Sequence, residues 1–411
     1  MAKPKIRFKG YTNEWEQRKA IDIADYSKGN GYSKGDLTDV GTPIILYGRL
    51  YTKYQFAISE VDTFAVPRNG AVYSQGNEVI VPASGETAED IARASAVEKS
   101  GVLLGGDLNI LRPFDFINPL FLALAISNGE PQKELAKKAQ GKSVVHIHNT
   151  DIQEVTIAYP SKTEQDRIVS VFRQLDNLIT LHQRKCDQAK KLKKYMLQKM
   201  FPKNNESVPE IRFEGFSDDW EQRKFGEMMN ITSVKRIHQS DWTDNGVRFL
   251  RARDIVAASK NEEPDDYLYI SEEKYEEYSA LSGKVDIDDL LVTGVGTIGV
   301  PYLVENLEPL YFKDGNIIWF QNKNKIDGKF LYYSFIGNGI QSFIKASAGT
   351  GTVGTYTIDT GKKTPIQIPS KEEQKKIGEY LTNIDNLITL HQKKCDQLKN
   401  LKKFMLQNMF V

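Results

Sequence analysis

The chain contains one long segment twice. Residues 159–201 (YPSKTEQDRIVSVFRQLDNLITLHQRKCDQAKKLKKYMLQKMF) return 209 residues later, at 368–410. About 27 of the 43 aligned positions are identical, which is far beyond chance for a single repeat of such a long period. Any fold for this chain must therefore place two copies of this segment in equivalent surroundings.

A shorter block repeats as well. PKIRF at 4–8 and EWEQRK at 14–19 recur as PEIRF at 209–213 and DWEQRK at 219–224, an offset of 205 residues that nearly equals the other offset. About 140 residues lie between the blocks in each half, and these two stretches look little alike. A duplicated frame with two divergent inserts predicts that the chain performs the same function twice, on two different targets.

Composition sets the broad class. At 411 residues the chain is too long for one ordinary core and suits two domains plus connectors. No apolar run approaches the ~18 residues of a membrane span, and the first ten residues lack the core of a signal peptide. Cys186 and Cys395 are equivalent in the repeat and have no metal-ligand spacing, so we expect a cytoplasmic protein in a reducing environment.

Both long repeats begin like helices. Ser161 with Glu164, and Ser370 with Glu373, have the Ser-x-x-Glu spacing of a capping box. In such a box the hydroxyl and the carboxylate satisfy free amide donors at the start of a helix. These motifs therefore predict where each helix begins.

Apolar residues then recur every three or four positions and predict two long helices, over 164–200 and 373–409. Each would be roughly 60 Å long at ~1.5 Å per residue, and its apolar stripe needs a partner. We expect the two helices to pack antiparallel, with the inserts at opposite ends and a pseudo-twofold axis near His182 and His391. In that register Cys186 and Cys395 would not form a disulfide. Both histidines lie on the stripe, which favours packing over catalysis.

The outer face of the first helix and its exit is basic, and the second copy repeats the pattern at 393–403. This face is as consistent with a surface for a partner subunit or for phosphates as with an ordinary solvated face. The cations of the first copy are Arg184, Lys185, Lys190, Lys191, Lys193, Lys194, Lys199 and Lys203.

The inserts, at about 20–158 and 225–367, are predicted to be mixed α/β (α+β) domains of one fold. GTPIILYGRL at 41–50 parallels GVRFLRARDI at 246–255, although the surrounding sequences differ. Short strand-like stretches alternate with turns and short helical patterns. The clearest are Pro43–Tyr47, Glu78–Pro82, Leu290–Thr293 and Asn316–Phe320.

The loops of the inserts are rich in side chains that hydrogen-bond base edges and phosphates. Ordinary surface polarity is the alternative for each of them. Candidates in the first insert are Arg49, Lys53, Tyr54, Arg68, Asn69, Tyr73, Ser74, Gln75, Lys142 and Ser143. Candidates in the second are Lys235, Arg236, Arg248, Arg251, Arg253, Thr293, Thr297, Lys313, Thr350 and Thr352.

Two glycine motifs, at 294–299 and 349–354, match G-x-G-x-x-G. A dinucleotide fingerprint must join a strand to a helix, whereas Pro301 and the β-like run at 356–358 follow these two. We interpret both as tight loops, with backbone amides that could face DNA phosphate. The sequence has no Walker loop, no H-E-x-x-H and no Cys/His cluster, so we expect no catalytic residues and no metal site.

The repeated helices, with PSK-x-EQ, DNLITLHQ, C-DQ-x-K and LKK-x-MLQ-x-MF, and the IRF and WEQRK segments resemble the specificity subunit of Type I restriction-modification systems. The resemblance covers essentially the whole chain. It implies two target-recognition domains that each read one half of a split double-stranded DNA site. It also implies helices that set the gap and bind two modification (methyltransferase) subunits, in a bacterium or an archaeon.

The resemblance also implies which subunit carries out which activity. The modification subunits would use S-adenosylmethionine to methylate adenine, the restriction (translocase) subunits would use ATP and Mg, and this chain would bind no cofactor. The division into domains follows: an N-terminal segment 1–19, the first target-recognition domain 20–158, a helix 159–203, a repeat of the N-terminal segment 204–224, the second target-recognition domain 225–367 and a helix 368–411.

Two other functions stay open at this stage. The chain could be a scaffold without enzymatic activity that binds RNA or protein through two domains. A self-sufficient methyltransferase or nuclease is weakened by the missing motifs. The net charge of +1 suits a DNA reader only if flanking subunits help to hold the duplex, because affinity comes largely from neutralised phosphates.

Overall fold

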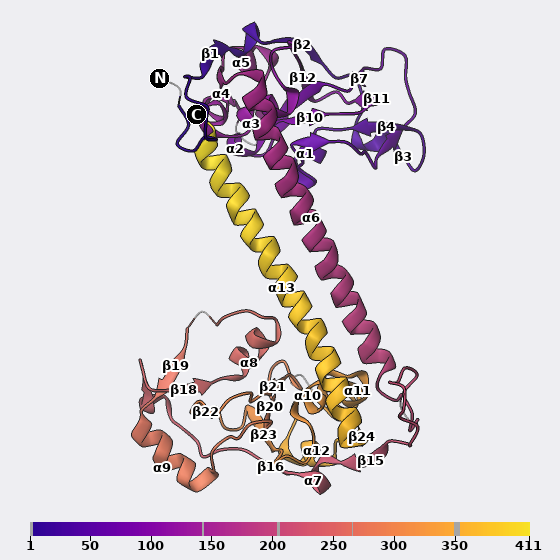
Figure 1. Cartoon of the computed structure of the whole chain (residues 1–411), viewed down its shortest axis with the longest axis vertical. Helices are drawn as coiled ribbons and strands as arrows, with labels where there is room; N and C mark the ends of the chain where they lie inside the picture. The colour runs from indigo at the N-terminus through magenta and orange to yellow at the C-terminus, as the bar shows by residue number, and fades with distance from the viewer. Residues whose placement is uncertain (1–2, 142–143, 204–205, 265, 349–353) are drawn as a thin grey trace. The chain divides into compact units, whose positions relative to one another are not determined.

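The computed structural model describes residues 3–141, 144–203, 206–264, 266–348 and 354–411 (Figure 1). The chain forms two compact units: unit 1 comprises Met1–His182 with Lys393–Val411, and unit 2 comprises Gln183–Gln392. Each unit has its own hydrophobic core. Among the residues described, every helix is too short or too polar to span a bilayer.

Two mixed sheets form the body of unit 1. The first has the strand order β2-β12-β8-β10-β5 and the second β3-β6-β4-β11-β7. Strand β8 is wholly buried because its run EVIVP lies between β12 and β10, and helix α3 covers it with six buried residues of eight. The strands of these sheets are β2 (Ala24–Lys28), β3 (Leu37–Thr38), β4 (Thr42–Ile45), β5 (Ala57–Ile58), β6 (Phe64–Ala65), β7 (Tyr73–Gln75), β8 (Glu78–Pro82), β10 (Ser95–Val97), β11 (Ser100–Leu104) and β12 (Leu108–Pro113).

Two sheets likewise form the body of unit 2, with the orders β16-β23-β20-β21 and β17-β19-β18-β22. Its core is more aromatic, and Phe225, Phe320 and Phe335 contact one another at ring-centroid distances of 5.2–5.8 Å. The strands are β16 (Asn230–Thr232), β17 (Trp242–Thr243), β18 (Val247–Leu250), β19 (Leu268–Ile270), β20 (Leu290–Thr293), β21 (Pro301–Leu303), β22 (Leu310–Phe312) and β23 (Ile317–Gln321).

The two units share one topology, as the sequence landmarks predict. The order β2-β12-β8-β10 corresponds to β16-β23-β20-β21, and β3-β6-β4-β11 corresponds to β17-β19-β18-β22. In each second sheet one pair is parallel, β4 with β11 and β18 with β22. The prediction of two mixed α/β domains of one fold is therefore confirmed, and the four predicted strands are β4, β8, β20 and β23.

The shorter helices recur as well. Helices α3, α4 and α5 of unit 1 correspond to α10, α11 and α12 of unit 2 at the offset of 209 residues, whereas α9 belongs to unit 2 alone. The helices of unit 1 are α1 (Arg49–Thr52), α2 (Ala88–Ile91), α3 (Pro119–Ile126), α4 (Gly129–Lys138) and α5 (Asn149–Gln153). Those of unit 2 are α7 (Phe225–Met228), α8 (Ala252–Ser259), α9 (Glu272–Ser282), α10 (Gly328–Ile336), α11 (Asn338–Ser347) and α12 (Ile358–Lys363).

The repeated EQRK segments form exposed strands in both units. In unit 1, β1 (Glu16–Lys19) pairs antiparallel with β14 (Thr156–Tyr159), and in unit 2, β15 (Glu221–Lys224) pairs with β24 (Pro365–Ile368). A further ribbon, β9 (Ser84–Gly85) with β13 (Val145–His146), lies in unit 1. Each of β14 and β24 leads directly into a long helix.

The long helices are α6 (Lys162–Lys199) and α13 (Lys371–Met409), within two residues of the predicted bounds. In unit 1, Asp176 contacts Lys402 and Phe172 contacts Phe410. The residue numbers thus run in opposite directions along the two helices, as antiparallel packing requires.

Unit 2 repeats this antiparallel pairing. Lys193 Nζ lies 2.7 Å from Asp385 Oδ2, which is the equivalent of the Asp176–Lys402 contact of 2.5 Å with the two helices exchanged. The thiol of Cys186 is buried against the carbonyl oxygen of Ile388. The prediction that the two helices pack antiparallel is confirmed within each unit.

The glutamates of the two Ser-x-x-Glu motifs have a role that the capping-box pattern does not predict. Glu164 accepts two hydrogen bonds of 2.7 Å from Arg7, and Glu373 accepts bonds of 2.7 and 2.8 Å from Arg212. Both carboxylates are buried. The serine half of the box does form in the second copy, where Ser370 Oγ accepts from the amide of Glu373. The glutamates therefore tie the IRF segments to the helix starts.

The end of the chain completes unit 1. The amide of Ile6 donates to the carbonyl oxygen of Asn408, and the amide of Glu130 donates to that of Val411. Phe410 is buried between Phe121 and Phe172. The segment around Ile6 and the last residues of α13 consequently lie side by side in unit 1 (Figure 1).

Candidate nucleic-acid interface

The loop that joins β2 to β3 contacts the loop after β6 in unit 1. Arg68 donates to the carbonyl oxygen of Gly31, forms an ion pair with Asp36 and lies over the ring of Tyr32 at 5.2 Å. Asn30 Nδ2 donates to the carbonyl oxygen of Gly70 at 2.7 Å. The Arg68 side chain remains 54% exposed, so a partner molecule can reach it.

The equivalent loop of unit 2, between β16 and β17, carries different chemistry. Arg236 Nε lies 2.9 Å from Asp314 Oδ2, and Lys235 Nζ lies over the Tyr278 ring at 4.7 Å. Lys313, beside Asp314, lies 3.8 Å from its carboxylate. In unit 1 two glycines, Gly31 and Gly106, approach each other at the corresponding place. The two units therefore present different groups from the same topological position.

Two cations meet one acid beside helix α1. Arg49 and Lys53 both contact Asp62, at 2.5 and 2.6 Å. Arg49 also donates to Gln55 and to the carbonyl oxygen of Glu60, and its side chain is only 9% exposed. Arg49 thus fixes the 55–62 loop, while Lys53 stays on the surface.

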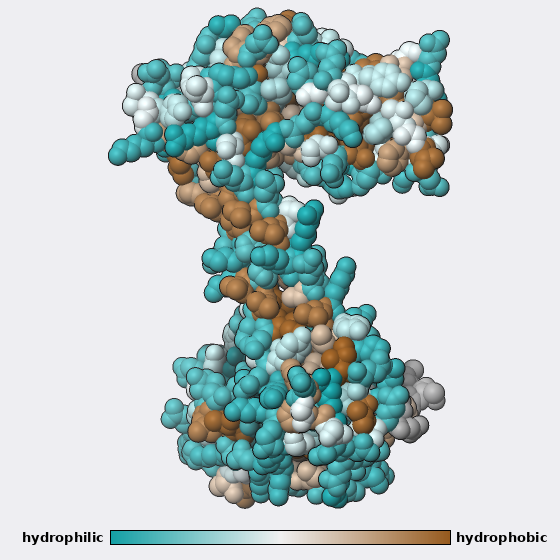
Figure 2. All heavy atoms as spheres, turned by 45° about the vertical axis from the view of Figure 1, so that its right-hand side comes forward, coloured by the Kyte–Doolittle hydropathy of each residue, from teal (hydrophilic) through white to brown (hydrophobic). Residues whose placement is uncertain are grey.

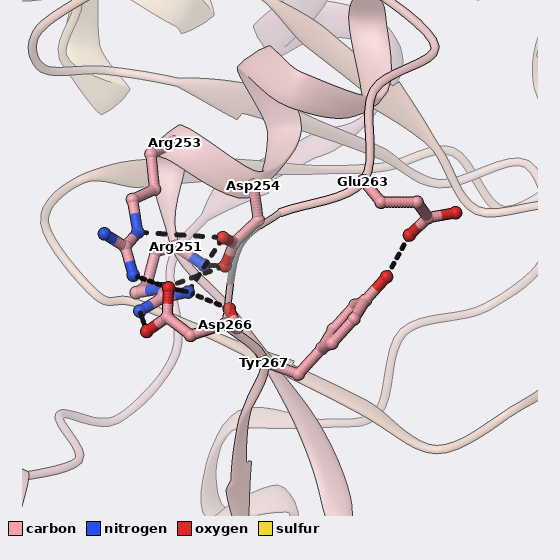
Figure 3. A network of polar contacts seen from close by, with 6 residues as sticks. All are labelled: Arg251, Arg253, Asp254, Glu263, Asp266 and Tyr267. Atoms are coloured by element: carbon pink, nitrogen blue, oxygen red, sulfur yellow. Dashed lines mark hydrogen bonds and ion pairs between the residues drawn. The ribbon is translucent and has the colours of Figure 1, made fainter. Parts of the chain in front are cut away.

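A similar network surrounds the start of helix α8 (Figure 3). Arg251 donates to the carboxylates of Asp254 and Asp266, and Arg253 forms a second ion pair with Asp266. Arg251 is the inner member, because its side chain is 15% exposed while that of Arg253 is 60% exposed.

An arginine and a tyrosine stack next to this network. The guanidinium of Arg248 lies 4.1 Å from the centre of the Tyr267 ring, and the Tyr267 hydroxyl donates to Glu263. The hydrogen bond to Glu263 raises the pKa of the Tyr267 phenol. Arg248 is half-buried, so this stack offers a flat polar surface rather than a free cation.

Three of the candidates hold loops together from within. Ser74 and Thr293 are buried: the Ser74 hydroxyl donates to the carbonyl oxygen of Lys99, and that of Thr293 donates to the carbonyl oxygen of Thr297. The Tyr54 hydroxyl donates to Ser127 at 3.2 Å and leaves the ring 38% exposed. The burial of Ser74 and Thr293 keeps both hydroxyls from reaching a duplex in this conformation.

Four other candidates are exposed. Asn69 lies in the loop after β6, Tyr73 and Gln75 point outward from β7, and Thr297 lies in the turn after β20. The remaining candidates lie outside the described residues; they are Lys142, Ser143, Thr350 and Thr352.

The first glycine motif is a hairpin turn. It joins β20 to β21, which pair antiparallel, and Gly296 and Gly299 have φ of +76° and +75°. A dinucleotide fingerprint leads into a helix, so the interpretation of this motif as a tight loop is confirmed. Of the second motif, 349–354, only Gly354 lies within the described residues.

One sizeable cleft lies at the duplicated frame rather than among these loops. A cleft of about 680 Å³ in unit 1 is lined by Arg7, Glu16, Arg18 and Phe116 among others. Within the described part of the chain, no three His, Cys, Asp or Glu side chains are grouped to hold a metal ion.

The long helices expose apolar residues in equivalent pairs. Leu178 and Leu181 of unit 1 correspond to Leu387 and Leu390 of unit 2, and all four are 42–51% exposed. Leu401 and Phe404 of unit 1 likewise correspond to Leu192 and Tyr195 of unit 2, at 40–53% exposure. Apolar groups gather among hydrophilic ones on the helix surface (Figure 2). Each unit thus carries the same apolar surface, beside exposed lysines of the repeats.

Sequence reasoning missed the acidic partners and these apolar pairs. Asp36, Asp62, Asp266 and Asp314 contact candidate cations, but the sequence separation varies from one residue to more than thirty. The apolar pairs could have been found, because each has a spacing of three and recurs 209 residues on; Leu192 and Leu401 belong to the predicted stripe, and the other six residues lie outside it.

Residues 12–191 and 217–400 match the family model of the Type I restriction modification DNA specificity domain. The chain is 25% identical over 409 residues to the Type I restriction enzyme MjaVIII specificity subunit of Methanocaldococcus jannaschii, covering 95% of this chain and 90% of that protein. It is 26% identical over 315 residues to the putative type I restriction enzyme MjaX specificity subunit of the same organism, covering 74% and 70%.

Two solved structures share the fold. The S subunit of the Type-I restriction-modification system from M. genitalium has a TM-score of 0.62 at 16% identity, with 100% of this chain and 99% of that chain covered. A chain from a study of the assembly and conformational transition of the type I R-M system has a TM-score of 0.52 at 16% identity, with 96% and 97% covered. At this identity the likeness concerns the fold alone.

Proposed function

The chain belongs to the family of Type I restriction modification DNA specificity domains, and we propose that it selects a split DNA sequence for a Type I restriction-modification complex. In this proposal each unit reads one half of the site from its target-recognition domain. The long helices hold the two readers and set the gap between the half-sites.

One observation carries the proposal: the frame is the same in both units while the loops differ. The Arg7–Glu164 pair recurs as Arg212–Glu373 with nearly identical distances. At the equivalent loop, by contrast, unit 1 has a glycine contact where unit 2 has Arg236. A constant frame with variable surfaces is what two readers of different sequences need, because base edges are distinguished by the side chains that reach them.

The low net charge and the paired cations suit a DNA-recognition subunit that binds DNA together with partner subunits. The net charge is +1, and several candidate cations are already paired with acids. Phosphate neutralisation supplies most of the affinity of an isolated DNA binder, so this chain needs partners that help to hold the duplex. We propose that the modification subunits do so and also flip the target adenine for methylation, with S-adenosylmethionine as methyl donor. The restriction subunits would use ATP and Mg, and this chain would be non-catalytic.

The duplicated apolar surface is the proposed dock for the modification subunits. Leu178, Leu181, Leu401 and Phe404 in unit 1 are matched one for one in unit 2. Exposed apolar patches beside charged residues are typical of protein interfaces. Because the same surface occurs twice, it suits two copies of one partner.

Mapping of methylated adenines across the genome, in cells with and without this gene, tests the proposal. We expect one split sequence to be methylated only when the gene is present. Exchange of residues 225–367 for the equivalent domain of a relative should then change one half of that sequence and leave the other half and the gap unchanged. A chimera that altered both halves, or a methylation pattern that did not depend on the gene, would contradict the proposal.

A further inference from the structure

In each unit two cations share one exposed aspartate. In unit 1, Asp62 contacts Arg49 at 2.5 Å and Lys53 at 2.6 Å. The Arg49 side chain is 9% exposed, whereas those of Lys53 and Asp62 are 53% and 61% exposed. One cation is therefore buried and holds the acid in place, and the other lies at the surface.

Unit 2 has a similar arrangement, to which the buried Asp254 adds a second acid, 3.0 Å from Arg251 and 3.9 Å from Arg253. Asp266 contacts Arg251 at 3.0 Å and also pairs with Arg253. The side chain of Arg251 is 15% exposed, while those of Arg253 and Asp266 are 60% and 55% exposed. Arg251 thus corresponds in role to Arg49, and Arg253 corresponds to Lys53.

The two clusters occupy the same topological place. Each pair of cations follows the parallel central strand, β4 or β18, and lies at or beside the short helix that comes next. Each aspartate comes shortly before the strand that returns to that sheet, β6 or β19.

The residues themselves are not equivalent in the sequence. At the 205-residue offset Asp62 aligns with Tyr267, and Arg49 aligns with Asp254. The arrangement is therefore shared although its residues occupy different positions at this offset.

We propose that Asp62 and Asp266 keep Lys53 and Arg253 neutralised in the free protein, and that DNA phosphates take over these two cations only when a unit is seated on its half-site. This inference rests on the proposed function. It makes the aspartates specificity-determining residues: they weaken binding to arbitrary DNA, where no base contacts compensate for breaking the ion pair.

The physical reason lies in the source of nonspecific affinity. Binding to arbitrary duplex comes almost wholly from cations that meet phosphates. A carboxylate that is already paired with such a cation competes with the phosphate and lowers the nonspecific affinity for DNA. Lys53 and Arg49 lower the pKa of Asp62, and Arg251 and Arg253 lower that of Asp266, so both acids stay ionised at neutral pH. The buried arginine prevents the acid from turning away.

The test uses the purified chain in complex with its modification subunits and a labelled 30-base-pair duplex of random sequence. Asp62→Asn and Asp266→Asn should each tighten binding roughly five- to tenfold at 0.1 M salt, and should steepen the slope of log affinity against log salt by about 0.9, as for one added phosphate contact.

Matched controls remove the same charge elsewhere. Asp39 and Asp244 are equivalent at the 205-residue offset, both are exposed, and none of the ion pairs in the described ranges involves either of them. Asp39→Asn and Asp244→Asn should change the affinity for the random duplex less than twofold. If they tighten binding as much as Asp62→Asn, the effect is one of net charge and the inference is wrong.

Double variants test the mechanism. Lys53→Gln in the Asp62→Asn background should abolish the gain, and Arg253→Gln should do so in the Asp266→Asn background, because the released cation is then absent. A gain that persisted without the cation would overturn the inference. If the wild-type complex bound no duplex at all, the proposed function itself would fail, which is a distinguishable outcome.

Discussion

Arg7 donates two hydrogen bonds of 2.7 Å to the carboxylate of Glu164, across 157 residues of sequence. Arg212 holds Glu373 in the same manner in unit 2. The pair joins the segment before each target-recognition domain to the helix that follows it. The entry and exit of each domain are therefore fixed to each other, whatever the sequence of the insert between them.

Removal of this arginine should destabilise the unit that contains it. Arg7→Ala leaves the Glu164 carboxylate, which is 1% exposed, without its charged partner, so we expect a loss of about 3 kcal/mol in the free energy of unfolding. Arg212→Ala should have a similar cost in unit 2. Urea denaturation followed by fluorescence measures both.

Lys133→Ala is the control, because its ion pair with Glu130 is 65–71% exposed and should be worth less than about 0.5 kcal/mol. An equal loss for Lys133→Ala and Arg7→Ala would show that burial does not set the strength of the frame pair.

The duplication allows the contacts of Asp385 to be compared with those of its equivalent, Asp176. Asp385 accepts from Lys193 and from the Tyr333 hydroxyl, both at 2.7 Å, whereas its equivalent Asp176 contacts Lys402. We expect Asp385→Asn to cost about 2 kcal/mol and Asp176→Asn about 1 kcal/mol, because a further hydrogen bond to a charged group is lost. In a Tyr333→Phe background the two substitutions should lower the free energy of unfolding by equal amounts. A difference that persists in that background would show that the hydrogen bond from Tyr333 is not its cause.

The apolar pairs should control the number of modification subunits. Leu178→Glu with Phe404→Glu places charges on the surface of unit 1, and Leu387→Glu with Tyr195→Glu does the same in unit 2. Each double variant should reduce the bound modification subunits from two to one in native mass spectrometry, since a buried charge without a partner is costly at an interface. Gln188→Glu, on an exposed position of the same helix, should leave two bound. Retention of two subunits by both double variants would rule out this surface as the dock.

The Asp62 cluster predicts an unusual titration. The hydrogen bond from Lys53 has the larger effect and that from Arg49 the next, and together they keep the pKa of Asp62 below its ordinary value of 3.8. Because the folded-state pKa is lowered, the stabilisation from this cluster is complete above pH 4 and disappears as the pH falls through the lowered pKa. Carbon-13 NMR of the carboxyl group should show this, and Lys53→Gln should move the titration back toward 3.8. Lys34→Gln, which lies in another loop, should leave it unchanged.

The duplicated parts of the fold could be predicted from the sequence. The stripes of α6 and α13 have helical spacing over more than 35 residues, and Glu78–Pro82 and Leu290–Thr293 are apolar runs bounded by turns. Such patterns depend on neighbours in the sequence. For that reason the bounds of these elements agree with the structure almost to the residue.

The polar contacts could not be predicted in the same way. Glu164 has the spacing of a capping residue, yet its charge is satisfied by Arg7, which no local pattern connects to it. Asp62 and Asp266 do not align, so comparison of the two halves does not reveal their shared role. Among the candidate DNA contacts, the burial of Ser74 and Thr293 depends on how their strands pair, which residue type alone does not determine.

The closing of unit 1 by the end of the chain has a consequence for biosynthesis. Unit 2 is continuous in the sequence, from Gln183 to Gln392, but the core of unit 1 contains Met409 and Phe410. The synthesis of unit 1 thus begins before that of unit 2, yet its core can be completed only after all of unit 2 has been made. Until Met409 and Phe410 have been synthesised, the apolar surface around Phe121 and Phe172 lacks their cover. A stop codon just before Met409 would therefore leave the core of unit 1 incomplete, although unit 2 is closer to that stop in the sequence.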